Sequence, residues 1–390
     1  MKSFEPADIG ECVESLARAA RERLRVGIVG GGTALELGNP GQPLDALLQT
    51  RRLNHVVEYA PEDQVIVAEA GVTLAELQSL AGKNGQWLGV DAPHAQRATL
   101  GGLVAVGAFG PRRARYGGIR ELLLGITLVR ADGAVAKSGS KVVKNVAGFD
   151  LPKVVCGSLG TLGLIAQVTL RLHPLPEASA TVQLDALTAA QVVDTRAALL
   201  RAQLEPSSLV ALYGSAGRYD LGVRFEGFQT GVTRDVDRLL SLLAPGVRHA
   251  RLDSASAAQF WQRHELARSV GELRARINAL PTELAPVEAA LGPLLGAMQS
   301  PQFVWYAGLG LGFVSGKPVN AEPAVLGLNG ARSGVVRLGG SLVVDAAPAE
   351  VRTKVDAWGP LPSSFSIMQE LKQRFDPERR LNAGRFIGGL

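Results

Sequence analysis

The stretch "VGIVGGGTALELG" (residues 26–38) places three consecutive glycines between an apolar run and a threonine. A backbone without Cβ atoms can approach another group closely, so this stretch predicts a tight turn after a strand and a candidate anion site. A Walker A loop would need a lysine after its last glycine, where Thr33 stands. A dinucleotide fingerprint would need a glycine in place of Leu35 and an acidic residue near positions 54–55, which hold Asn and His. Both familiar nucleotide loops are therefore excluded.

Bulk composition excludes several classes of protein. The chain has 390 residues, 46% hydrophobic and 20% charged, which is typical of a packed globular protein with two domains. The net charge of +5 is modest, so nucleic-acid binding is not expected. Two cysteines provide no disulfide framework. We find neither an apolar signal core nor a run of 18 apolar residues, and we therefore expect a soluble cytoplasmic protein.

Local patterns predict the first elements. Asp8 with Glu11, and Thr73 with Glu76, have the spacing of helix capping pairs and each precedes a helical apolar stripe. Asp132-Gly133 predicts a hairpin turn between two strands.

The middle of the chain changes character. Over residues 181–253 strands and helices are expected in the order β-α-β-β-α-β, which is typical of a ferredoxin-like layer. Further α+β elements follow, in which residues 302–313 and 334–346 are both interpreted as strands.

Further glycine-rich motifs follow the first one in a fixed order. They are "TLGGLVAVGAFG" (99–110), "GPRRARYGGIRELLLG" (110–125), "KNVAGFDL" (144–151), "GSLGTLGLI" (157–165) and "LNAGRF" (381–386). In this order the motifs resemble the FAD-binding fold of the vanillyl-alcohol oxidase and p-cresol methylhydroxylase (PCMH) class. Within that class the chain is similar to the FAD-binding (E) subunits of glycolate oxidases. The resemblance covers about residues 1–175 and 355–390.

The resemblance implies an α+β fold with three segments. Residues 1–175 would form the PCMH-type FAD-binding domain of two α+β subdomains. Residues 176–355 would form a smaller, inserted, ferredoxin-like α+β cap. Residues 356–390 would return to the FAD-binding domain.

The resemblance also implies where FAD binds. Successive N–H groups of a glycine-rich turn can converge on a pyrophosphate without a lysine, and the later motifs would supply two further walls. No histidine lies between residues 26 and 38, so non-covalent FAD is expected. Ala383 replaces the proline of the family's C-terminal turn. The predicted cofactor-binding residues are Val29, Gly30, Gly31, Gly32, Thr33, Ala34, Pro93, Thr99, Leu100, Gly101, Gly102, Ala105, Gly157, Thr161, Gly163, Ile165, Asn382 and Arg385.

The cap offers few catalytic candidates. Related hydroxy-acid dehydrogenases carry a paired-histidine metal site there, whereas this chain has only His249 and His264 after residue 176, so no metal is expected. Arg263 could anchor a carboxylate and His264 could act as a base. Neighbouring residues on a helix point about 100° apart, which works against a shared substrate.

The implied function is that of an FAD-binding subunit of a multi-subunit glycolate (2-hydroxy acid) oxidase. Its partners would be a D-type flavin subunit and an iron–sulfur subunit, since two cysteines cannot hold a cluster. The complex could bring the chain to the inner membrane peripherally. Two alternatives stay open: a non-catalytic scaffold that retains the flavin fold, and a stand-alone FAD oxidoreductase. Arg112, Arg113 and Arg115 form either a solvated face or a docking patch for a partner.

Overall fold

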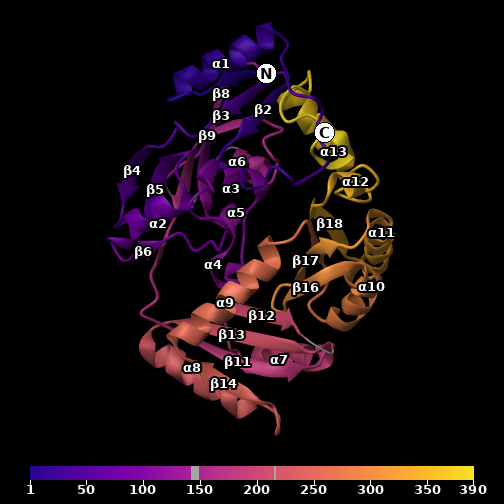
Figure 1. The fold of residues 1–390 in the computed structure, drawn as a ribbon. Coiled ribbons are helices and arrows are strands. Elements are labelled where there is room, and N and C mark those ends of the chain that lie inside the picture. The colour runs from indigo at the N-terminus through magenta and orange to yellow at the C-terminus, as the bar shows by residue number, and fades with distance from the viewer. Residues whose placement is uncertain (142–148, 215–216) are drawn as a thin grey trace. The chain divides into compact units, whose positions relative to one another are not determined.

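The computed structural model describes residues 1–141, 149–214 and 217–390 (Figure 1). The chain divides into two compact units. Unit 1 contains residues 1–110, 116–175 and 360–390, and unit 2 contains residues 111–115 and 176–359. No helix within the described ranges is both long and apolar enough to cross a membrane.

Two sheets form the framework of unit 1. A parallel sheet of order β1-β3-β2 consists of β1 (Lys2–Phe4), β3 (Ala46–Gln49) and β2 (Val26–Val29). An antiparallel sheet of order β4-β5-β9-β7-β8 consists of β4 (Val56–Ala60), β5 (Val65–Glu69), β9 (Leu164–Arg171), β7 (Leu123–Val129) and β8 (Val135–Gly139). A short pair joins β6 (Gln86–Trp87) and β10 (His173–Pro174).

The helices of unit 1 cover these sheets and begin where the sequence predicts. Asp8 caps α1 (Ile9–Arg21), and Thr73 with Glu76 forms a capping box on α2 (Leu74–Gly82). The expected turn at Asp132-Gly133 joins β7 to β8. The other helical segments of unit 1 are α3 (Leu100–Val106), α5 (Ile119–Leu122), α6 (Leu151–Val155), α13 (Phe365–Phe375) and the 3-10 turn η2 (Ile387–Gly389). The short helix α4 (Arg113–Tyr116) belongs to unit 2 except for Tyr116.

Two apolar cores lie within unit 1. One joins α2, α3 and α5 to one face of the five-stranded sheet, through residues such as Leu77, Leu103 and Leu122. The other joins α1 to the parallel sheet and to Val129 and Leu164, which point to the opposite face. The parallel sheet is thereby held against the five-stranded sheet by buried apolar contact.

Unit 2 contains two ferredoxin-like motifs in one sheet. The first comprises β11 (Ala178–Leu187), α7 (Ala189–Arg201), β12 (Ser208–Tyr213), β13 (Tyr219–Gly227), α8 (Gln229–Leu242) and β14 (His249–Leu252). The second comprises β15 (Leu273–Asn278), α10 (Leu284–Gly296), β16 (Met298–Tyr306), β17 (Leu311–Pro318), α11 (Ala321–Arg337) and β18 (Ser341–Ala346). The strand order β14-β11-β13-β12-β16-β17-β15-β18 repeats one topology twice, and antiparallel β12–β16 pairing joins the halves.

The predicted ferredoxin-like order is thus confirmed, but one expected strand is wrong. Residues 334–337 are the last turn of α11, and only residues 341–346 form a strand. The glycines in "LGLNGARSG" conceal the helix from a propensity argument. Gly327 and Gly334 serve close packing there, because a Cβ would lie 2.8 Å from the Leu294 Cα and 2.6 Å from the Ala290 Cβ, respectively.

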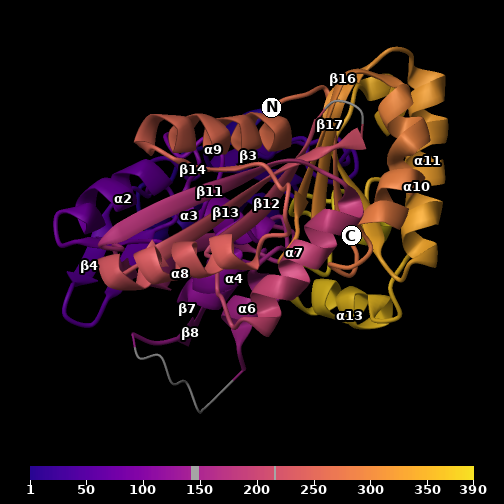
Figure 2. The same cartoon turned by 90° about the horizontal axis from the view of Figure 1, so that it is seen from below.

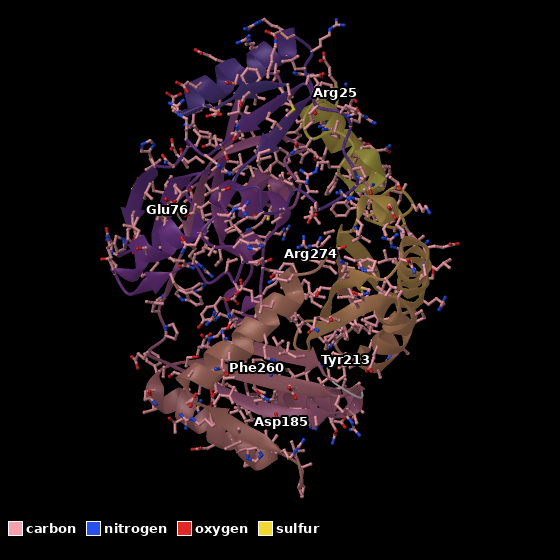
Figure 3. The ribbon with its side chains drawn as sticks, viewed as in Figure 1. Arg25, Glu76, Asp185, Tyr213, Phe260 and Arg274 are labelled. Atoms are coloured by element: carbon pink, nitrogen blue, oxygen red, sulfur yellow. The ribbon has the colours of Figure 1, made fainter. Side chains whose placement is uncertain are left out.

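Different helices pack on the two faces of the eight-stranded sheet. α7, α8, α10 and α11 share one continuous apolar core with it. Helix α9 (Ser254–Ser269) lies on the other side of β11 and β13 from α8 (Figure 2). Phe260, labelled in Figure 3, comes from α9 and packs where Gly222 leaves room on β13. The short helix α12 (Ala349–Arg352) follows β18.

We predict that Gly222→Ala destabilises the protein by about 1–3 kcal/mol, because the new Cβ would lie 2.3 Å from the buried Phe260 ring. Urea denaturation measures the change in the free energy of unfolding. Gly330→Ala is the matched control, since this exposed position within α11 has no atom within 4 Å of an added Cβ. It should stabilise by about 0.5–1 kcal/mol. Equal effects of the two substitutions would contradict the packing described for α9.

Candidate functional site

An open pocket lies in unit 1 around the glycine loop. Three segments meet there: the loop after β2, helix α3 and the segment around Leu159. Arg385, near the C-terminus, lies beside them. The lining residues are Ile28, Val29, Gly30, Gly31, Gly32, Thr33, Ala34, Leu35, Thr99, Gly102, Leu103, Ala105, Val106, Leu159 and Arg385.

The glycines of the first loop are required by the neighbouring chain. A Cβ on Gly30 would lie 2.3 Å from the Thr99 Oγ1, and one on Gly31 would lie 1.6 Å from the Arg97 carbonyl oxygen. Gly32 has φ +70°, a backbone conformation that favours glycine. We expected these positions to lack a Cβ so that a ligand could approach, but at Gly30 and Gly31 the approaching group is the protein's own 97–99 segment.

The N–H groups of the loop are directed to no other part of the described protein. Within the described ranges, the backbone N–H groups of Gly31, Gly32, Thr33 and Ala34 donate to no recorded acceptor. Gly31 is buried, and buried N–H groups normally have a partner. Successive unpartnered N–H groups in a turn form a concave site for an anion. The loop can therefore hold a phosphate group without a lysine.

Helix α3 supplies the second wall. Thr99 caps it by accepting a hydrogen bond from the Gly102 N–H at 3.3 Å. Thr99, Gly102 and Val106 recur at helical spacing and line the pocket, whereas Leu100 and Gly101 face the core. A Cβ on Gly101 would lie 2.7 Å from the Ala70 Cβ.

The third wall is held by the C-terminal segment. The Asn382 side chain accepts a hydrogen bond from the Ile28 N–H at 3.0 Å and donates one to the Leu159 carbonyl at 2.7 Å. It therefore joins the strand before the glycine loop to the 159 region. Arg385 donates to the carbonyls of Ala34, Leu35 and Leu37, so its guanidinium closes the back of the loop.

A buried ion pair anchors that segment. Lys372 and Asp376 have side chains 2% and 0% exposed, and their charged atoms lie 2.7 Å apart. Lys372 also donates to the Thr161 carbonyl at 2.7 Å, and Asp376 accepts from the Leu381 N–H at 2.8 Å. Burial lowers the pKa of Lys372, and the Asp376 carboxylate opposes that shift. The pair therefore connects α13 both to the backbone at Thr161 and to the segment that contains Asn382.

The pocket contains ten of the predicted cofactor-binding residues. These are Val29, Gly30, Gly31, Gly32, Thr33, Ala34, Thr99, Gly102, Ala105 and Arg385. The remaining predicted residues do not line it: Pro93, Leu100, Gly101, Gly157, Thr161, Gly163, Ile165 and Asn382. Thr161 and Ile165 are buried, and Gly163 packs on Leu128. Lys144 and Asn145 of the "KNVAGFDL" motif lie outside the described residues.

Sequence reasoning missed the apolar part of the lining. Ile28, Leu35, Leu103, Val106 and Leu159 belong to it. The helical period of α3 could have identified Leu103 and Val106, since they follow Thr99 at i+4 and i+7. Leu159 had no local signal, because its place depends on the contact with Asn382.

The two predicted catalytic residues of the cap have different surroundings. Arg263 is exposed, and its Nη2 lies 3.1 Å from an Asp220 carboxylate oxygen. His264 is buried, and its Nε2 lies 2.8 Å from the Tyr306 hydroxyl. Burial, together with the positive charges of Arg268 and Arg224, lowers the pKa of His264 to about 3. A catalytic role for this pair stays a prediction, although His264 has neither the exposure nor the basicity of a catalytic base.

The arginines of the 112–115 segment belong to unit 2. Arg112 makes a bidentate ion pair with Glu226, whose side chain is 2% exposed, with a shortest distance of 2.7 Å. The pair ties the segment to β13. Of the two interpretations, a solvated face or a docking patch, neither fits Arg112.

Comparisons with protein families and with known proteins identify relatives of this chain. Residues 3–139 match the family model of the FAD binding domain. The chain is 34% identical over 174 residues to glycolate oxidase subunit GlcE of Escherichia coli (strain K12), covering 44% of this chain and 49% of that protein. It is 34% identical over 170 residues to a D-lactate dehydrogenase of Archaeoglobus fulgidus, covering 44% and 38%. It is 27% identical over 177 residues to glycolate oxidase subunit GlcD of Bacillus subtilis (strain 168), covering 45% and 38%.

These matches span about half the length of the relatives, or less. The fold is shared more widely: alkyldihydroxyacetonephosphate synthase superposes with a TM-score of 0.72 over 97% of this chain and 75% of that chain, at 16% identity. The predicted PCMH-type FAD-binding fold is therefore confirmed, as is FAD as the cofactor. Non-covalent attachment stays a prediction.

We predict that Asn382→Asp lowers the free energy of unfolding by about 1–3 kcal/mol, because a buried carboxylate oxygen would face the Leu159 carbonyl without a donor. Aspartate is a suitable replacement because it tolerates the φ of +44° at this position. Affinity for FAD, measured by flavin fluorescence, should fall as well. Asn39→Asp, in the same unit, is the matched control. An Asn382→Asp protein with unchanged stability would contradict the bridging role of the amide.

We predict that His264 makes the protein less stable in acid. Its folded pKa of about 3 lies below its ordinary value of 6.5, so the unfolded chain binds more protons between these values, and stability falls as the pH drops through this window. By pH 5 the loss should be about 2 kcal/mol. Urea denaturation at pH 7 and pH 5 measures it. His264→Gln should flatten the dependence, whereas His249→Gln, at an exposed position, should leave it unchanged.

Proposed function

We propose that this chain, in which residues 3–139 form an FAD binding domain, is the FAD-binding subunit of a multi-subunit 2-hydroxy-acid oxidase. The observation that carries the proposal is the set of unpartnered N–H groups at Gly31–Ala34, which lies within the residues that match the FAD binding domain. Glycolate is the proposed substrate and glyoxylate the product. The similarity to D-lactate dehydrogenases supports the broader class of small 2-hydroxy acids.

The residues present fit FAD. The N–H groups of Gly31 to Ala34 would hold the pyrophosphate, and Leu103, Val106 and Leu159 offer apolar surface to the flat ring system. Bound FAD supplies a two-electron acceptor for the oxidation of an alcohol to a carbonyl group. The protein's part is to fix the orientation of the cofactor and to limit its contact with water.

Partner subunits complete the proposed complex. Arg263 is engaged by Asp220, and His264 is buried against Tyr306. The unit 2 residues that were the best candidates for substrate contact are therefore committed elsewhere. A D-type flavin subunit would supply the hydroxy-acid site, in line with the similarity to GlcD. An iron–sulfur subunit would accept the electrons, because two cysteines are too few for the ligands of a cluster.

The engagement of Arg263 and His264 within unit 2 also supports a second candidate function. A subunit whose Arg263 and His264 are both engaged can serve as a scaffold that retains the flavin fold without turning over a substrate. In either case we propose a cytoplasmic location, with the complex associated peripherally with the inner membrane.

We predict that the purified chain is yellow and that glycolate bleaches its visible flavin absorbance only when both partner subunits are present. Co-purification from the host under anaerobic conditions, with mass analysis of the partners, tests this. Acetate, which lacks the hydroxyl group, is the control ligand. A chain that is active as an isolated monomer would overturn the complex. A chain that remains colourless with added FAD would overturn the flavin assignment, and flavin that is never reduced within the complex would favour the scaffold.

A further inference from the structure

A cation lies beside the unpartnered N–H groups of the glycine loop. The turn that contains His94 presents Arg97, and the N–H groups of Arg97 and Ala98 both donate to the His94 carbonyl at 2.8 Å. His94 adopts φ +59°, a backbone conformation that non-glycine residues seldom hold away from functional sites. The Arg97 side chain is exposed and leads back to the loop, where its Nη2 lies 3.4 Å from the Gly31 carbonyl oxygen.

That guanidinium is only loosely held. A distance of 3.4 Å is long for an N–H···O bond, which usually spans about 2.7–3.2 Å. Arginine carries five N–H donors, and among the described residues no other acceptor is recorded for those of Arg97. The same Nη2 would lie 3.9 Å from a Cβ on Gly32, so the charge also faces the middle of the loop.

Two sets of donors at the glycine loop therefore have the capacity for a further acceptor. One is the row of N–H groups at Gly31–Ala34, and the other is the remaining guanidinium face of Arg97. Arg385, the other arginine at the loop, is already engaged by three carbonyls. A phosphate group that bridges the two sets would satisfy both, because a guanidinium binds phosphate oxygens through paired, charge-assisted hydrogen bonds.

We propose that Arg97 is a cofactor-binding residue that would contact the pyrophosphate of FAD together with the loop amides. The proposal rests on the proposed function and deepens it. It makes Arg97 the charged member of a site that otherwise binds by backbone alone. Arg97 thereby favours flavins that carry phosphate over riboflavin, which has the ring system but no phosphate.

The test measures the affinity of the apoprotein for FAD, ADP and riboflavin by fluorescence and calorimetry. Arg97→Gln should raise the Kd for FAD and for ADP about tenfold, as expected for the loss of one charge-assisted phosphate contact. Riboflavin affinity should stay unchanged. Added salt should weaken FAD binding to the wild type more than to Arg97→Gln, and Arg97→Lys should recover part of the affinity.

Arg21→Gln is the matched control, because it removes the same charge from an exposed position in unit 1, at the C-terminal end of α1. Equal FAD affinity of the wild type and Arg97→Gln would overturn the role of Arg97 and leave the flavin assignment intact. A parallel loss of riboflavin affinity would also overturn it, because the effect would then be structural. A wild-type protein that binds neither FAD nor ADP would overturn both proposals. ADP binding that depends on Arg97, without FAD binding, would support the anion site and reject the flavin.

Discussion

The peptide between Arg97 and Ala98 lies so close to the Gly31 Cα that a single added carbon would overlap the Arg97 carbonyl, at 1.6 Å. This contact determines the shape of the pocket. It fixes the glycine loop against the start of α3, where Thr99 both caps the helix and fills the space beside Gly30. The N–H groups of residues 31–34 have no partner in the described protein. The candidate anion site therefore combines two features, a loop packed against the 97–99 segment and a row of unpartnered N–H groups.

A second constraint keeps this arrangement in place from the far end of the chain. The Lys372–Asp376 pair is removed from water, which is costly unless every charge finds a partner. Here the ammonium group contacts two carbonyls in addition to the carboxylate, and Asp376 Oδ2 also accepts from the Leu381 N–H. Among the described residues the buried Asp376 Oδ1 has no hydrogen-bond partner. Such a pair adds little net stability compared with apolar side chains, but it specifies one geometry. Asn382 then joins the Ile28 and Leu159 backbones. The C-terminal segment therefore acts as a clamp on two walls of the pocket.

Unit 2 is stabilised mainly by one shared apolar core under a continuous sheet. Its two ferredoxin-like motifs share one apolar core, so the unpaired edges of β12 and β16 are removed by pairing with each other. The face opposite this core holds α9 and buries polar groups such as His264 and Tyr306. Burial of His264 beside two arginines keeps its imidazole neutral.

The sequence by itself determined the α+β character, the capped helices, the ferredoxin-like order of residues 181–253 and the glycine loop after a strand, because each follows from local spacing and chemistry. Only the tertiary structure decided what each glycine accommodates, since Gly30, Gly31 and Gly101 lie against neighbouring segments of the protein. It also decided the places of Leu159, Arg97 and Asn382, which depend on partners distant along the chain. Helix α11 was missed for the same reason: its glycines weaken the helix signal but allow close packing against α10. The local sequence pattern determines where helices, strands and turns form. Contacts between segments that are distant along the chain determine which backbone N–H groups are left without a hydrogen-bond acceptor.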